Sequence, residues 1–120
     1  MPMRAAIYTR NEFNEKGEVI TDVAKQEESC RKHAEKHGYL ITQVYHEANV
    51  GQDDERLELR SLRSAIWKRN IDVLLATKPD RLYYDTNRLA RFIKEADLMS
   101  VRLEFVEAPL DDEYWLRESW

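Results

Sequence analysis

The sequence feature that most constrains the fold is an uninterrupted apolar run, Val73–Ala76, at the centre of the stretch Asp72–Thr77. A strand that is apolar at every position is buried on both faces, and such strands occur mainly in parallel sheets covered by helices. Ala5–Tyr8 has the same character and predicts a second buried strand, which ends at Thr9 and Arg10. The sequence therefore predicts a parallel sheet at the core of the protein.

Two further segments have strand patterns. Tyr39–Tyr45 is rich in β-branched and aromatic residues, which favours a strand. Val101–Val106 alternates apolar with charged residues and predicts a strand with one solvated face. Asn11–Thr21 and Glu47–Asp54 are polar, and we expect both to be loops.

The segments between the strands have helical periodicity. Asp22 is expected to cap the first helix, which should end before Gly38, where a left-handed C-cap glycine belongs. A second helix is expected to begin at the acidic residues 53–55 and to run to about Arg69. A third helix, capped within Asp85–Thr86, carries its apolar side chains on one face.

Strands that alternate with helices predict an α/β fold: a three-layer, mostly parallel sheet of about four to five strands with helices on both faces. The chain has 120 residues, three glycines and three prolines, and it contains no low-complexity tract. We therefore expect a single domain over residues 1–120. Ligands of such sheets bind beyond the carboxyl ends of the strands.

Composition excludes several classes of protein. The mean hydropathy is -0.72 and no long apolar run is present, so a soluble, cytoplasmic protein with no membrane contact is expected. One cysteine, Cys30, and no zinc-like spacing argue against disulfides and metals. A net charge of -4 argues against non-specific coating of nucleic acid. Residues 8–12 contain no glycine-rich phosphate loop, so no nucleotide cofactor is expected.

Three arginines lie on segments that this topology brings to one edge of the sheet: Arg10, Arg56 and Arg81. Their forked guanidinium donors suit the oxygens of a phosphodiester, and Asp80 could orient one of them. The alternative is that they are separate surface arginines, and the topology alone leaves it open.

Further arginines recur along the second and third predicted helices. Arg56, Arg60 and Arg63 recur on the second helix, and Arg88 and Arg91 on the third. Either stripe could follow a nucleic-acid backbone, with Arg60 and Arg88 as candidate contacts, or it could be a solvated face.

The first predicted helix carries histidine and cysteine, which are residue types found in metal sites and as nucleophiles. His33 and His37 have the spacing of a metal-binding pair but lack an evident third ligand. Cys30 lies on the apolar face, so we expect it to be a core residue rather than a nucleophile.

Several motifs in one order resemble the catalytic domain of the serine site-specific recombinases, the resolvase and invertase family. They are the opening strand through Tyr8-Thr9-Arg10, the helix and turn from Gln26 to Tyr39, the Gly51 loop leading to Arg56, and Asp80-Arg81-Leu82 within residues 78–85. The resemblance covers nearly all of the chain.

The resemblance implies a metal-free phosphoryl-transfer site. In that family, a serine two residues after the first arginine attacks a DNA phosphate, and arginines neutralise that phosphate through the transition state. Carried over by position, Arg10 resembles the first active-site arginine and Arg56 the arginine that opens the second helix. Asp80 and Arg81 resemble the acid and arginine of the motif after the third strand.

The chain departs from the family pattern at the nucleophile, where Glu12 occupies the position of the serine. Tyr84 replaces the last arginine of the Asp-Arg-Leu motif, and Asn49-Val50 precedes Gly51 where the family usually has a serine. We therefore expect catalysis by the family mechanism to fail, because a carboxylate repels phosphate. Glu12 could pair with the arginines as an acidic plug, or it could point into solvent.

The family's long dimerising helix and its DNA-binding domain are expected to be missing, because the sequence ends at Trp120. Weak or indirect DNA contact is therefore expected.

Three functions remain open at this point. The chain could be an inactive recombinase-like domain that regulates or assists an active recombinase. It could instead cleave DNA with a substitute hydroxyl, Thr9 or Tyr84. It could also be an assembly module that self-associates through its aromatic carboxyl-terminal residues, which are Tyr114, Trp115, Leu116 and Trp120.

Overall fold

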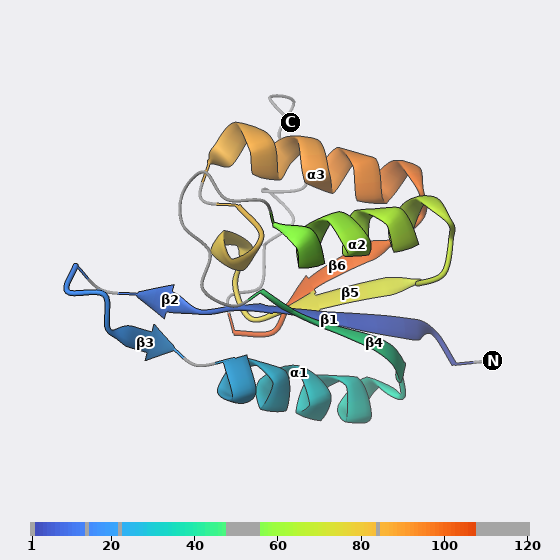
Figure 1. The fold of residues 1–120 in the computed structure, drawn as a ribbon. Helices are drawn as coiled ribbons and strands as arrows, with labels where there is room; N and C mark the ends of the chain where they lie inside the picture. Colours follow the sequence, from blue (N-terminus) through green and yellow to red (C-terminus); the bar gives the residue numbers. More distant parts are fainter. Residues whose placement is uncertain (1, 14, 22, 48–55, 84, 108–120) are drawn as a thin grey trace.

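The computed structural model describes residues 2–13, 15–21, 23–47, 56–83 and 85–107. Its centre is a four-stranded sheet in the order β4-β1-β5-β6, and every pairing within it is parallel (Figure 1). The strands are β1 (Arg4–Arg10), β4 (Leu40–Glu47), β5 (Val73–Ala76) and β6 (Arg102–Phe105). The predicted three-layer α/β fold is confirmed.

Helices cover both faces of this sheet (Figure 1). Helix α1 (Val23–His37) lies on one face, and α2 (Leu57–Trp67) and α3 (Thr86–Leu98) lie side by side on the other. A short 3-10 helix, η1 (Pro79–Arg81), follows β5. Among the described residues, no helix has the length and apolar character needed to cross a membrane.

The alternation of side chains along β1 builds two cores. Ala5 and Ile7 pack toward α1, whereas Ala6 and Tyr8 pack toward α2 and α3. All four side chains are fully buried, as expected for a central strand with helices on both sides. Val73–Ala76 of β5 is buried at every position, which confirms the prediction made from its apolar run.

Two of the predicted helix caps are confirmed. Asp85 accepts a 2.8 Å hydrogen bond from the backbone N–H of Asn87, so it is the residue that caps α3. Gly38 has φ of +72° and ends α1, because a residue without Cβ enters the left-handed region at little cost. The predicted cap Asp22 and the acidic residues 53–55 lie outside the described residues.

Three predictions of secondary structure are wrong. The expected loop at residues 11–21 contains an antiparallel hairpin of β2 (Glu12–Phe13) and β3 (Val19–Thr21), whose connection includes Gly17 at φ of +80°. Strand β4 continues through Glu47 because Arg10 of β1 pairs with it in register. Helix α2 ends at Trp67 rather than near Arg69, which adopts φ of +58°.

Candidate active site

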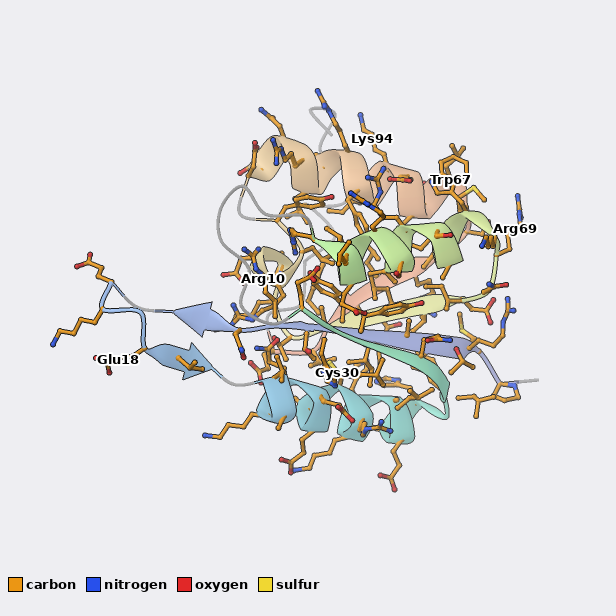
Figure 2. The ribbon with its side chains drawn as sticks, in the orientation of Figure 1. Arg10, Glu18, Cys30, Trp67, Arg69 and Lys94 are labelled. Atoms are coloured by element: carbon orange, nitrogen blue, oxygen red, sulfur yellow. The ribbon has the colours of Figure 1, made fainter. Side chains whose placement is uncertain are left out.

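The carboxyl ends of β1 and β5 meet at one edge of the sheet, because the two strands are parallel neighbours. Arg10 is the last residue of β1 and lies near η1, as Figure 2 shows. Arg81 belongs to η1, and Arg56 directly precedes α2. The fold thus brings the backbones that carry the three predicted arginines to the same edge.

Arg56 joins three of the segments at this edge. Its Nη2 donates to the hydroxyl of Tyr8 at 2.7 Å and to the carbonyl of Arg81 at 3.0 Å, and its Nη1 donates to the carbonyl of Leu82. The guanidinium lies 5.7 Å from the ring centroid of Tyr8 and 5.2 Å from that of Tyr83. Only 15% of the Arg56 side chain is exposed. This arginine therefore ties β1 and α2 to the segment after β5.

Glu47 places a buried negative charge at this edge. One of its carboxylate oxygens lies 3.9 Å from Arg56 Nε, and the whole residue is 5% exposed. The carboxylate accepts hydrogen bonds from the backbone N–H groups of Glu58 at 3.3 Å and Leu59 at 3.0 Å. These groups belong to the first turn of α2, where the helix dipole favours negative charge. Glu47 thus caps α2 and faces Arg56 at the same time.

Tyr8 links the two charged groups. Its hydroxyl accepts from Arg56 and donates to Glu47 at 3.1 Å. Burial raises the pKa of Tyr8 far above its ordinary range, although Arg56 opposes this shift. The hydroxyl therefore stays protonated and can act as the donor to Glu47.

Sequence reasoning missed Glu47 and Tyr8 as members of the site. An acidic residue at the end of the second strand, level with Arg10 at the end of the first, could have identified Glu47.

Arg81 is turned into the protein. Its side chain is 2% exposed, and Nη1 lies 3.3 Å from the carboxylate of Asp80, which is 39% exposed. The structure therefore places Asp80 beside Arg81.

The end of β1 is held by a side chain from α1. Gln26, which is 1% exposed, accepts from the Arg10 N–H at 3.0 Å and donates to the Arg10 carbonyl at 2.6 Å. These two bonds fix the backbone from which the chain enters β2. Glu12 lies in β2, but its side chain and the whole of Tyr84 fall outside the described part of the chain. The acidic plug at Glu12 stays a prediction.

Three of the remaining predicted arginines line a groove between α2 and α3. Arg60 and Arg63 come from α2, and Arg88 comes from α3. Arg56 lies at one end of the same groove. The structure thus brings the two helix stripes together.

Comparison with known proteins identifies the family. The family model described as the resolvase N-terminal domain matches residues 5–115. The chain belongs to the resolvase family. No curated protein sequence matches it at a significant level.

Solved serine recombinases have the same fold as this resolvase domain. The C-terminal catalytic domain of ISC1926 TnpA, an IS607-like serine recombinase, is 26% identical with a TM-score of 0.74, and the alignment covers 87% of this chain and 70% of that one. The N-terminal catalytic domain of TP901-1 integrase is 22% identical with a TM-score of 0.76, covering 92% and 82%. A resolvase family recombinase from Streptococcus pneumoniae is 18% identical with a TM-score of 0.74, covering 92% and 76%.

Thr9 lies on the opposite face of the resolvase sheet from Arg56. It is fully buried and alternates with Tyr8, so it faces α1. Its hydroxyl lies 2.6 Å from His46 Nδ1, and His46 Nε2 lies 2.9 Å from a carboxylate oxygen of Glu27. A hydroxyl next to an imidazole that is itself next to a carboxylate is the arrangement found when a base activates a nucleophile. The sheet nevertheless separates it from the arginines.

The histidines of α1 interact with Glu104 of β6. The rings of His33 and His37 lie 4.3 Å apart, and His33 Nε2 is 2.7 Å from the Glu104 carboxylate, which also accepts from Tyr39 at 2.6 Å. In the described ranges, no three His, Cys, Asp or Glu side chains form a group able to hold a metal ion.

Cys30 is buried between α1 and the sheet (Figure 2). Burial raises its pKa to about 12. The prediction that it is a core residue is confirmed by this burial.

Proposed function

We propose that this resolvase domain takes part in site-specific DNA recombination without cutting DNA itself. It acts through protein contacts, as a regulator or accessory of an active recombinase, and residues 1–120 form one catalytic-domain-like unit. Its direct contact with DNA is weak and uses Arg10, Arg60 and Arg88. Arg56 and Arg81, which the sequence also suggested, are instead engaged within the protein.

The observation that carries this proposal is the residue at the nucleophile position. Glu12 stands two residues after Arg10, where the resemblance calls for a serine. A carboxylate does not form a stable phosphodiester link, and its charge repels an approaching phosphate. Attack by the family mechanism therefore has no hydroxyl at that position.

The contacts that Arg56 makes within the protein support the same conclusion. Arg56 donates three hydrogen bonds to protein oxygens, from Tyr8, Arg81 and Leu82. Its Nε makes no hydrogen bond within the part of the chain that the structure describes, but it faces the carboxylate of Glu47. A phosphodiester would have to displace these partners before Arg56 could stabilise a transition state, and transition-state stabilisation depends on donors arranged in advance.

The deciding experiment is a cleavage assay on supercoiled DNA that carries recombination sites. The unaltered chain is incubated with the DNA, and protein attached to DNA ends is sought by denaturing electrophoresis and mass spectrometry, with an active serine recombinase as positive control. We expect no adduct. An adduct mapped to Thr9 or Tyr84 would overturn the proposal and establish the substitute-nucleophile alternative.

A pair of variants tests the stated cause. Glu12→Ser restores a hydroxyl and removes the repulsive charge, but Tyr84 leaves the site one arginine short, and loss of one such donor commonly costs about a hundredfold to a thousandfold in rate. We therefore expect no detectable adduct with Glu12→Ser alone. The Glu12→Ser, Tyr84→Arg double variant, fused to the dimer helix and DNA-binding domain of an active relative, is expected to cleave. Cleavage by the single variant would show that the site is intact apart from its nucleophile.

Binding to duplex DNA is expected to be weak and confined to low salt. The net charge of -4 opposes approach to a polyanion, and affinity that comes from phosphate contacts falls steeply with salt. Fluorescence anisotropy with a labelled duplex across a salt series measures this. Tight binding that persists at physiological salt would contradict it.

A further inference from the structure

The groove between α2 and α3 carries several arginines, of which the proposed function uses Arg60 and Arg88. It is a hollow of about 450 Å³. Its lining residues are Arg56, Leu59, Arg60, Arg63, Ser64, Trp67, Tyr83, Arg88 and Glu95. Arg91 and Phe92 continue it along α3. The lining thus combines several guanidinium groups with aromatic rings.

Charge is distributed unevenly along the chain. Residues 56–98, which include both helices of the groove, contain ten Lys and Arg against six Asp and Glu, although the whole chain has a net charge of -4. The segment that carries the groove is therefore net positive within an acidic chain. Local concentration of one sign attracts ligands of the opposite sign.

A carboxylate of the protein already occupies part of the groove. Glu95 of α3 accepts from Arg63 Nη2, at 3.0 Å to one oxygen and 3.3 Å to the other, and from the indole Nε1 of Trp67. Only 14% of the Glu95 side chain is exposed. The groove therefore binds an anionic group with a guanidinium and an indole N–H, and Glu95 competes with any anionic ligand.

Aromatic rings lie at both ends of the groove. Tyr83 packs against Arg56 at one end, and Trp67, which is 51% exposed, lies at the other end of α2 beside α3 (Figure 2). At a rise of about 1.5 Å per residue, Arg56 and Trp67 are about 16 Å apart along the helix axis. That length accommodates a few nucleotides, and exposed aromatic rings are surfaces on which bases stack.

Exposed rings favour a single strand over a duplex as the ligand. Bases within a duplex are stacked on one another, whereas unpaired bases can stack on aromatic side chains while the phosphates contact the arginines. We propose that the groove between α2 and α3 binds a short stretch of single-stranded nucleic acid. Arg63, Arg88 and Arg91 bind its phosphates, and Trp67 stacks on a base.

The test uses the full chain and a fluorescein-labelled ten-nucleotide oligothymidylate, with binding followed by fluorescence anisotropy at low salt. Arg88→Ala and Arg91→Ala are each expected to weaken binding about threefold, as exposed charge contacts do. Trp67→Ala is expected to weaken it at least about fivefold through lost stacking. The matched control is Arg31→Ala on α1, which removes an exposed arginine from the opposite face of the molecule and should leave binding unchanged.

Glu95→Gln provides a test in the opposite direction. It removes the resident charge and frees Arg63, so binding of oligothymidylate should strengthen about threefold. Circular dichroism of each variant confirms that the helices are intact. A gain of affinity distinguishes this inference from a purely structural role of the groove, because a structural defect would not improve binding.

Three results would overturn the inference. The first is an equal loss of affinity in Arg31→Ala, which would indicate non-specific charge attraction. The second is a duplex that competes as well as the single strand, and the third is poly-glutamate that competes as well, which would favour an acidic protein partner. The DNA cleavage assay tests a different property, so failure of the proposed function and failure of this inference are separable.

Discussion

Replacement of Glu47 by alanine tests whether the buried network around Arg56 holds the carboxyl edge of the sheet together. The substitution removes the acceptor for Tyr8, the cap for the N–H groups of Glu58 and Leu59, and the carboxylate nearest to Arg56 Nε. Arg56 would remain largely buried without its counter-charge, so the folded state should lose stability.

The magnitude follows from two contributions. Loss of a helix N-cap costs about 1 kcal/mol, and removal of one member of a buried ion pair costs about 3–5 kcal/mol. The two overlap, because the same carboxylate makes both interactions, so we expect a total of about 3–5 kcal/mol for Glu47→Ala. That is a large fraction of the roughly 5–15 kcal/mol that stabilises a typical domain. Glu47→Gln keeps an acceptor oxygen, and we expect it to cost about 1–3 kcal/mol.

The assay is urea unfolding followed by far-ultraviolet circular dichroism, which gives the free energy of unfolding of each variant. The control is Glu28→Ala, whose carboxylate pairs with Lys32 at 3.1 Å on the exposed face of α1, and it should cost less than about 0.5 kcal/mol. A double-mutant cycle with Arg56→Met isolates the coupling between Glu47 and Arg56. A cost below about 0.5 kcal/mol for Glu47→Ala, or zero coupling in the cycle, would refute the reasoning.

Other predictions concern α1 and its neighbours. Cys30 should resist alkylation by iodoacetamide in the folded protein and react on unfolding, because burial raises its pKa to about 12 and only the thiolate reacts; fast labelling of the native chain would contradict this. Burial raises the pKa of Glu104, but hydrogen bonds from Tyr39 and His33 outweigh it, and the net pKa lies below the ordinary 4.5. Its stabilising contribution is therefore complete above pH 4.5 and is lost as pH falls through the lowered pKa. The free energy of unfolding, measured across pH 2–7, should therefore fall less at low pH in Glu104→Gln than in the unaltered chain. Gly38→Ala should cost about 1 kcal/mol in urea unfolding, since alanine is strained at φ of +72°, and an unchanged midpoint would show that the turn relaxes.

Much of the fold could be predicted because its signals are local. The apolar run at residues 73–76 predicted a strand buried on both faces, and Gly38 and Asp85 marked helix ends that the structure confirms. The hairpin β2-β3 could not be predicted in the same way. Its pairing is antiparallel with an irregular register, and no apolar periodicity marks its residues in the sequence.

The candidate site, too, could be predicted only in part. The sequence placed Arg10, Arg56 and Arg81 on segments that meet at one edge, because strands alternating with helices run parallel and have their carboxyl ends at the same edge. It did not indicate that Arg56 would turn inward to backbone carbonyls. A long side chain selects its rotamer from partners that only the folded chain supplies, so this orientation depends on the contact between α2 and η1.

By itself, the sequence determined the alternation of sheet strands with helices, the helix ends marked by Gly38 and Asp85, and the residue types available at the edge of the sheet, because each depends on residues a few positions apart. The tertiary structure decided which of those residues meet. Parallel pairing of β1 with β4 set Glu47 level with Arg10, and the pleat sent Tyr8 toward Arg56 and Thr9 toward α1. A shift of one residue in β1 would exchange those faces, and the register is fixed by packing between segments far apart in the chain.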